Sequence, residues 1–225
     1  AFNQAIGQWD VSRVRNMKGM FRSAAAFNQN IGQWNVSQVT NMRYMFANAA
    51  AFNQNIGQWN VSQVTNMRYM FANAAAFNQD INTKEVTAEN SPTGQAYTAW
   101  NVSQVIDMSY MFLNAKSFNK PIGNWNVSKV TDMNTMFGGA DVFNQDINTK
   151  EITAENSPTG VAYTAWIVSS VTYMGEMFNG ASNFNQPLNS WNVSSVYFMF
   201  MMFKGASSFN QPLDLWDVSD LEDMQ

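Results

Sequence analysis

The chain repeats one 25-residue pattern from end to end, and this repetition restricts its fold more than any other feature. Each unit begins one residue before a Phe-Asn pair and reads approximately A-F-N-Q-x-I-G-x-W-N-V-S-x-V-T-N-M-x-x-M-F-x-x-A-x. We number the positions of this unit as places 1 to 25. The eight units are residues 1–25, 26–50, 51–75, 76–116, 117–141, 142–182, 183–207 and the partial unit 208–225. The sequence therefore predicts one solenoid domain over residues 1–225, in which neighbouring units stack.

Large apolar side chains recur at fixed places in these units. All eight Trp residues occupy place 9, and fifteen of the 16 Met residues occupy places 17 and 20. Rows as regular as these are typical of core packing rather than of a ligand channel. We therefore expect Trp34, Trp59 and Trp125 to be buried.

The spacing within a unit predicts one short strand and one short helix. Residues 34–37 alternate apolar and polar, as a half-buried strand does. Met17, Met20, Phe21 and Ala24 follow the i, i+3, i+4, i+7 spacing of one helix face. An Asn or Asp at place 16 precedes this run as an N-cap does, and in three units a Gly at place 23 follows it as a helix end does. We expect an α/β solenoid, a right-handed coil with one short parallel strand and one short helix per repeat.

Two units carry the same 16-residue insertion, at residues 82–97 and 148–163. In each copy two β-prone runs flank a Ser-Pro-Thr-Gly turn. This pattern predicts a hairpin that projects from one rim. Because six units lack the insertion, we expect it to be dispensable for stacking.

The repeat motif also resembles a known family. Residues 39–49 (Val-Thr-Asn-Met-Arg-Tyr-Met-Phe-Ala-Asn-Ala) and 52–62 (Phe-Asn-Gln-Asn-Ile-Gly-Gln-Trp-Asn-Val-Ser) look like the repeats of BspA-like leucine-rich-repeat surface proteins, closest to the branch common in mycoplasma lipoproteins. The resemblance covers essentially the whole chain. It implies a leucine-rich-repeat-like coil at the cell surface or outside the cell, associated with adhesion or host contact. It implies no catalytic or binding residues.

Composition argues against several functional classes. The chain has no His and no Cys, so the commonest general base and the commonest metal ligands are missing, and we expect no enzyme activity, no metal and no cofactor. The net charge of −4 disfavours nucleic acid as the main partner. No apolar run reaches the ~20 residues that a membrane span needs.

Polar rows recur as well. The Asn at place 3 is present in all eight units, from Asn3 to Asn210. This row is either a sugar-binding surface or, as we expect, a buried ladder in which each amide bonds to the backbone.

The residues that break the repeat are the most informative about function. Units six and seven replace polar consensus residues with apolar ones, so we predict an exposed partner-binding patch of Ile167, Tyr173, Tyr197, Phe198, Phe200 and Met201. The alternative is a local variant of the core.

Charge is also distributed unevenly. Residues 1–75 hold six basic side chains and one acidic one, whereas the remainder holds six basic and 15 acidic. Arg13 and Arg15 at one end and Asp220 and Glu222 at the other predict an end-to-end contact between copies. Alternatively, neighbouring repeats of a longer protein cover both ends.

Three functions are compatible with these features. The first is a non-enzymatic cell-surface repeat protein that binds other proteins or host surface molecules. The second is a structural subunit whose partner is itself, assembled into filaments. The third is a glycan- or ligand-binding module that uses the polar rows.

Overall fold

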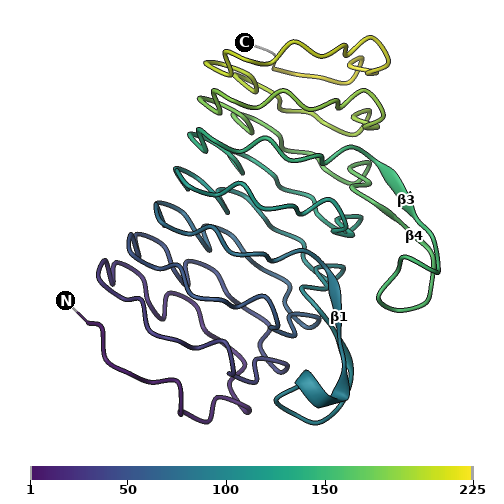
Figure 1. Cartoon of the computed structure of the whole chain (residues 1–225). Helices are drawn as coiled ribbons and strands as arrows, with labels where there is room; N and C mark the ends of the chain where they lie inside the picture. Colours follow the sequence, from purple (N-terminus) through teal and green to yellow (C-terminus); the bar gives the residue numbers. More distant parts are fainter. Residues whose placement is uncertain (1, 224–225) are drawn as a thin grey trace.

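The computed structural model describes residues 2–223 and consists of a stack of similar coils (Figure 1). Each repeat unit forms one coil, and the coils follow one another from the N-terminal to the C-terminal end. Two longer loops leave the stack on the same side. The expectation of a regularly stacked repeat structure is confirmed.

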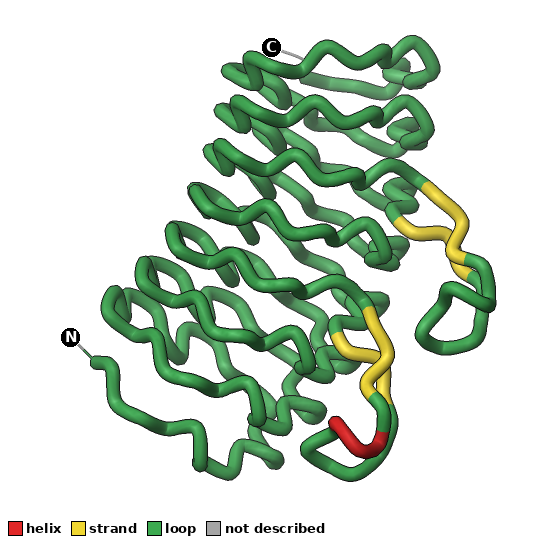
Figure 2. The backbone as a smooth tube through the Cα atoms, in the orientation of Figure 1, coloured by secondary structure: helices red, strands yellow, loops and turns green. Residues whose placement is uncertain are grey.

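Regular secondary structure is almost absent, as the loop colour of Figure 2 shows. Among residues 2–223 the strands are β1 (Lys84–Val86), β2 (Tyr97–Ala99), β3 (Lys150–Ile152) and β4 (Tyr163–Ala165), and the one helix is the short 3-10 element η1 (Ala88–Asn90). All five lie in or at the edge of the insertions. The α/β class, with one parallel strand and one helix per repeat, was therefore wrong.

A run of turns takes the place of the expected helix. Met45 N–H donates to Met42 O at 3.1 Å and Ala49 N–H donates to Phe46 O at 3.0 Å, so the chain turns back every three residues. The backbone φ is positive at place 19 and again at place 23, for example 59° at Tyr44, which no α-helix accommodates. Such turns still direct places 17, 20, 21 and 24 inward, which is why their spacing imitates a helix face.

The residue at place 16 is not a helix cap. Asn41 Oδ1 accepts the N–H of Arg43 at 3.0 Å, a side-chain turn that begins the run. Its backbone forms an isolated parallel bridge to Asn66, and the same bridge links every consecutive pair of coils from Asn16 to Asp223.

Hydrogen bonds between coils alternate with those inside them. Met42, Tyr44 and Phe46 donate their N–H groups to Asn66 O, Arg68 O and Met70 O of the next coil, at 3.0, 2.9 and 2.9 Å. The intervening N–H groups close the turns. Backbone polarity is thereby satisfied beside the core without a continuous sheet.

The predicted strand around place 9 is also a turn, because Trp34 N–H donates to Ile31 O and Val39 N–H donates to Val36 O. The inward direction of the Trp row was nevertheless right. Trp34, Trp59 and Trp125 expose 2%, 1% and 0% of their surface, which confirms their burial.

Two rows of stacked Phe rings form the centre of the core. Rings at place 21 follow one another at 5.5–5.7 Å between centroids, as for Phe46 and Phe71 at 5.6 Å. Rings at place 2 run parallel to them, and the Phe46 ring centroid lies 3.9 Å from that of Phe52. The stacking continues across unit boundaries, so the core belongs to the whole stack.

The Asn row at place 3 forms a complete ladder along one corner. Each Oδ1 accepts the backbone N–H of the next Asn at 2.9–3.0 Å, from Asn3 to Asn210. The ladder was predicted, but its burial was not correct: Asn3, Asn28 and Asn210 are exposed and the others half-buried.

Each insertion forms an antiparallel hairpin. β1 pairs with β2, with Glu85 opposite Thr98, and β3 pairs with β4 in the same register. The hairpins fold back over the units that precede them. The hydroxyl of Tyr97 donates to Gln58 O, and that of Tyr163 donates to Asn124 O at 2.6 Å.

Candidate interaction surfaces

Four apolar side chains of units six to seven lie on one wall of the stack, and we call them the wall patch: Tyr173, Tyr197, Phe198 and Met201. The Tyr173 and Phe198 rings stack in parallel with centroids 5.3 Å apart. Tyr173, Tyr197 and Met201 expose 43%, 44% and 38% of their surface, whereas Phe198 is half-buried. The other units carry polar residues at places 15 and 16, Ile106 excepted, whereas three of them carry Tyr at the place of Met201.

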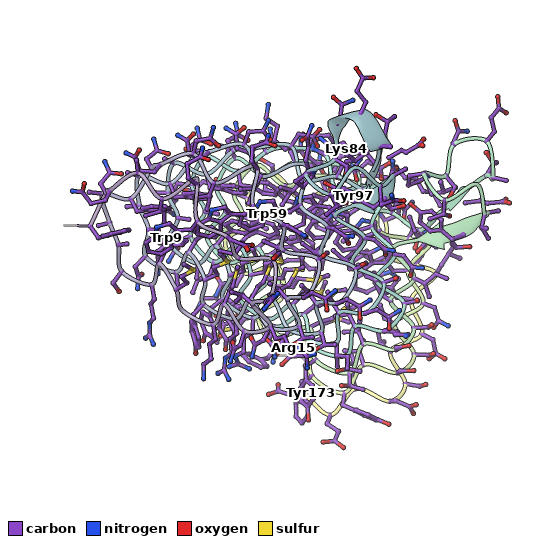
Figure 3. The ribbon with its side chains drawn as sticks, turned by 90° about the horizontal axis from the view of Figure 1, so that it is seen from below. Trp9, Arg15, Trp59, Lys84, Tyr97 and Tyr173 are labelled. Carbon is purple, nitrogen blue, oxygen red and sulfur yellow. The ribbon has the colours of Figure 1, made fainter. Side chains whose placement is uncertain are left out.

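Of the other two predicted patch residues, Phe200 is half-buried and lies over Gly175, the residue at its own place in the preceding unit, where a Cβ would stand 2.4 Å from its ring. Ile167 belongs to place 10, whose Asn residues lie beneath the hairpins. Figure 3 shows Tyr173 on the side opposite Tyr97. The structure therefore brings the wall patch together but does not include Ile167 in it.

An apolar hollow of about 660 Å³ opens at the C-terminal end of the stack. Met199, Met201, Met202, Phe203, Leu213, Trp216 and Val218 contribute most of its lining. Met201 joins it to the wall patch. Sequence reasoning did not identify this hollow, although the end of the Phe row at Phe203 was a visible signal.

The predicted end-contact residues lie at opposite ends of the stack. Arg13 and Arg15 are exposed in the first coil, and Asp220 and Glu222 are exposed in the last. They are too far apart to pair within one molecule, so any contact between them joins two molecules.

An arginine–tyrosine ladder along the first four units was not anticipated. The Tyr44, Tyr69 and Tyr110 rings stack at 4.8 and 4.3 Å between centroids. The guanidinium of Arg43 lies 4.8 Å from the Tyr44 ring centroid, and that of Arg68 lies 5.2 Å from both Tyr69 and Tyr110. The cations and rings thus pair with one another.

The environment of the ladder also shifts the pKa values of two of its tyrosines. Burial opposes ionisation of Tyr44, but the hydrogen bond and charge of Arg43 outweigh it and lower the pKa of Tyr44. Burial, followed by the neighbouring Tyr110, raises the pKa of Tyr69. Below the ladder, burial raises the pKa of Asp132, although Arg68 approaches its carboxylate at 3.9 Å.

Two similar pockets lie beneath the hairpins, and their linings differ at the hairpin residue that is Gln95 in one and Val161 in the other. The first, of about 160 Å³, lies between the hairpin tip at Pro92 and Thr93 and the polar row of units two and three. The second, of about 150 Å³, lies between Pro158 and Thr159 and the row of units four and five. No Asp, Glu, Lys or Arg lines either pocket.

Within residues 2–223 there is no group of three acidic side chains placed to hold a metal ion. The same residues contain no helix of the length and apolarity that membrane crossing requires.

Stacked coils, stacked aromatic rows and amide ladders define a repeat protein with several separate surfaces. The chain belongs to the family described as "Mycoplasma protein of unknown function, DUF285", which matches residues 1–93, 86–158 and 159–225. No curated protein and no solved structure is significantly similar to it.

Proposed function

We propose that this chain is a non-enzymatic repeat protein of the cell surface that binds other proteins or host surface molecules. The observation that carries this proposal is the wall patch. Tyr173, Tyr197 and Met201 are each more than a third exposed, and at the places of Tyr173 and Tyr197 the other units carry mainly polar residues. Exposed aromatic clusters on soluble proteins usually mark contact sites.

The wall patch has the properties of an interface anchor. The Tyr173 and Phe198 rings lie parallel at 5.3 Å, and each Tyr or Phe side chain has few rotatable bonds, so covering the pair costs less conformational entropy than covering long flexible side chains. Burying each aromatic side chain contributes roughly 1.5–3 kcal/mol.

The cell-surface location rests on the resemblance to BspA-like leucine-rich-repeat proteins. Membership of a family described from Mycoplasma is compatible with that resemblance. Within this proposal, the stack holds the wall patch outward for contact with a host.

Adhesion of purified protein to host cells tests the proposal. Tyr197→Thr combined with Phe198→Asn restores residues that other units carry at the same places. The matched control is Leu215→Gln, which replaces an apolar side chain that is 71% exposed by the residue that units one to three carry at the same place. We expect the patch variant to lose most adhesion and the control to retain it. If the patch variant folds and adheres as well as the unsubstituted chain, the wall patch is not the adhesion site.

Head-to-tail assembly is the second candidate, and the end charges favour it. Arg13 and Asp220 share place 13, and Arg15 and Glu222 share place 15. Place-15 residues of successive coils lie in register, as the 2.8 Å bond from Thr40 N–H to Arg15 O shows. A second copy stacked on the last coil would bring each Arg beside a carboxylate.

Charge reversal tests this assembly. Arg13→Glu with Arg15→Glu should block association measured by sedimentation, and adding Asp220→Arg with Glu222→Arg should restore it. If neither set of substitutions alters the association, and added salt does not weaken it, the charged contact is excluded.

A further inference from the structure

We propose that each hairpin covers a binding pocket for one unit of a neutral saccharide, so that the chain carries two equivalent sugar sites. These pockets lie on the side opposite the wall patch, and the inference does not depend on the proposed function (Figure 3).

The first step is that the pocket is built twice. The insertions at 82–97 and 148–163 differ only at Val86/Ile152 and Gln95/Val161. Each folds back over the two preceding units and is held there by one Tyr hydroxyl. Burial raises the pKa of Tyr97 and of Tyr163, so both hydroxyls keep the proton that they donate. Repetition of the same pocket at both insertions shows that the insertion creates it.

The second step is the orientation of the amides beneath the tip. In the first pocket Asn35 Oδ1 accepts Ser37 N–H at 3.2 Å, and Asn60 Oδ1 accepts Ser62 N–H at 3.2 Å. Because a backbone N–H can bond only to the amide oxygen, the amide nitrogen of each Asn is the atom left for a ligand. Neither nitrogen has a protein partner among the described residues.

The second pocket repeats this arrangement one insertion later. Asn101 Oδ1 accepts Ser103 N–H at 3.1 Å, and Asn126 Oδ1 accepts Ser128 N–H at 3.2 Å. Both amides line the pocket. The two sites therefore present the same pair of fixed amide donors.

The third step concerns the serine hydroxyls at place 12. Ser62, Ser128 and Ser194 each donate their hydroxyl to the Asn two residues earlier, at 2.7–2.8 Å. Ser37 and Ser103 are the place-12 serines that line the pockets, and their hydroxyls have no partner in residues 2–223. In the same part of the chain Ser169 also lacks a hydroxyl partner, because Ile167 stands where the accepting Asn would be; Ser37 and Ser103 keep that Asn and still leave the hydroxyl available in the pocket.

These features together select the ligand class. Amide donors and a free hydroxyl beside the Tyr97 or Tyr163 side chain offer directed hydrogen bonds together with an aromatic surface. A sugar ring can use both features, because it carries hydroxyls at its edge and C–H groups on its faces. The absence of ionisable acid or base side chains from both linings disfavours a phosphate, a carboxylate or an ammonium ligand. A volume of about 160 Å³, on the order of five water molecules, suits one monosaccharide unit.

Substitution of the amides gives the test. Asn60→Asp and Asn126→Asp each replace an amide donor by a carboxylate acceptor of the same shape. The repeat tolerates this change, since Asp10 and Asp217 occupy the same place and accept the same Ser N–H at 3.0 and 3.1 Å. Asn192→Asp is the matched control, because Asn192 bonds to Ser194 in the same way with no hairpin above it.

The probes are the methyl glycosides of glucose, galactose, mannose and N-acetylglucosamine and their β-linked disaccharides. Binding is measured by saturation-transfer NMR and calorimetry on the full chain. At least one probe should bind with two sites per chain. Asn60→Asp or Asn126→Asp should each remove one site, and the double variant should weaken binding about tenfold or more.

Three results would overturn the proposal. One is the absence of binding by every probe at tens of millimolar, and another is unchanged binding by the double variant. The third is an equal loss in Asn192→Asp. Each is distinguishable from failure of the proposed function, because substitutions in the wall patch leave the pockets intact and these substitutions leave the patch intact.

Discussion

The indole N–H of Trp59 donates to the backbone carbonyl of Ile31, one coil earlier, at 3.2 Å inside the core. Every later Trp repeats this bond, and Trp125 bonds to Ile81 O at 3.0 Å. The Trp row therefore does more than fill volume. It satisfies a carbonyl where each coil turns.

Replacing Trp125 with Phe should destabilise the stack by about 1–3 kcal/mol, because the buried carbonyl of Ile81 loses its donor. Trp9→Phe is the control, since Trp9 is 54% exposed and its indole N–H has no carbonyl partner among residues 2–223. Urea unfolding measures both. If both substitutions lower the free energy of unfolding by the same small amount, the indole hydrogen bond contributes nothing beyond ring packing.

The Asn ladder makes a parallel prediction. Asn53 Oδ1 accepts both Asn78 N–H and Gln79 Nε2 at 2.9 and 2.8 Å, so Asn53→Ala removes two bonds and should cost about 1–3 kcal/mol. Asn210→Ala removes a ladder side chain whose Oδ1 accepts no hydrogen bond among residues 2–223, and should cost much less. The unfolding free energies of the two variants should differ clearly, and similar values would count against the ladder.

Phe200 and Gly175 should be energetically coupled. Gly175→Ala places a methyl group within contact distance of the Phe200 ring and should destabilise by about 1–3 kcal/mol. In a Phe200→Ser background, with the Ser that unit four carries at this place, the same change should be nearly neutral. A double-mutant cycle on thermal unfolding measures the coupling. Additive effects would mean that the ring does not fill this space.

Asp132 should make stability depend on pH. Burial raises its pKa in the folded chain, so folding favours the protonated form. The resulting penalty is present above the folded pKa and disappears as the pH falls below the ordinary Asp value of about 3.9.

Asp132→Asn should therefore stabilise the chain slightly near pH 7, by less than about 1 kcal/mol, and not at all near pH 3. The exposed Asp220→Asn serves as a control. Denaturation midpoints across this range give the comparison. A gain for Asp132→Asn that persists at pH 3 would contradict burial of the charged carboxylate as its cause.

Deleting residues 82–97 and 148–163 should leave a single cooperative unfolding transition. Unit five shows the reason, because Ile122 is joined to Trp125 by Gly123 and Asn124 alone and still forms a regular coil. Circular dichroism and urea titration measure the transition. A chain that no longer unfolds cooperatively would show that the hairpins seal the edge of the core.

Repeat length, unit stacking and inward rows could be predicted from the sequence, because they follow from identity between units. The sequence offered no comparable reason to reject the predicted helix of each unit. The residues at places 17, 20, 21 and 24 face inward in a run of turns, as they would in a helix. The decisive signal was the positive φ at place 19, where Tyr44, Tyr69 and Tyr110 stand. Tyr rarely adopts this conformation, and their mutual stacking at 4.8 and 4.3 Å offsets its cost.

Some features of the candidate surfaces could also be predicted from the sequence, and others could not. The apolar replacements at Tyr173 and Phe198 were predictable, because the consensus at their place is polar. The position of Ile167 on another side was not, since it depends on how the coil turns between places 10 and 16. The pockets were also beyond sequence reasoning. They depend on the direction in which the hairpin folds back, which the Tyr97 hydroxyl bond to Gln58 fixes.

The central functional claim is that the chain presents its surfaces to other molecules rather than to copies of itself. Electron microscopy of the purified chain over a range of concentrations tests it most directly. The claim predicts isolated particles of a single 25.3 kDa chain at every concentration. Filaments that lengthen with concentration and dissolve in high salt would contradict it and establish head-to-tail assembly instead.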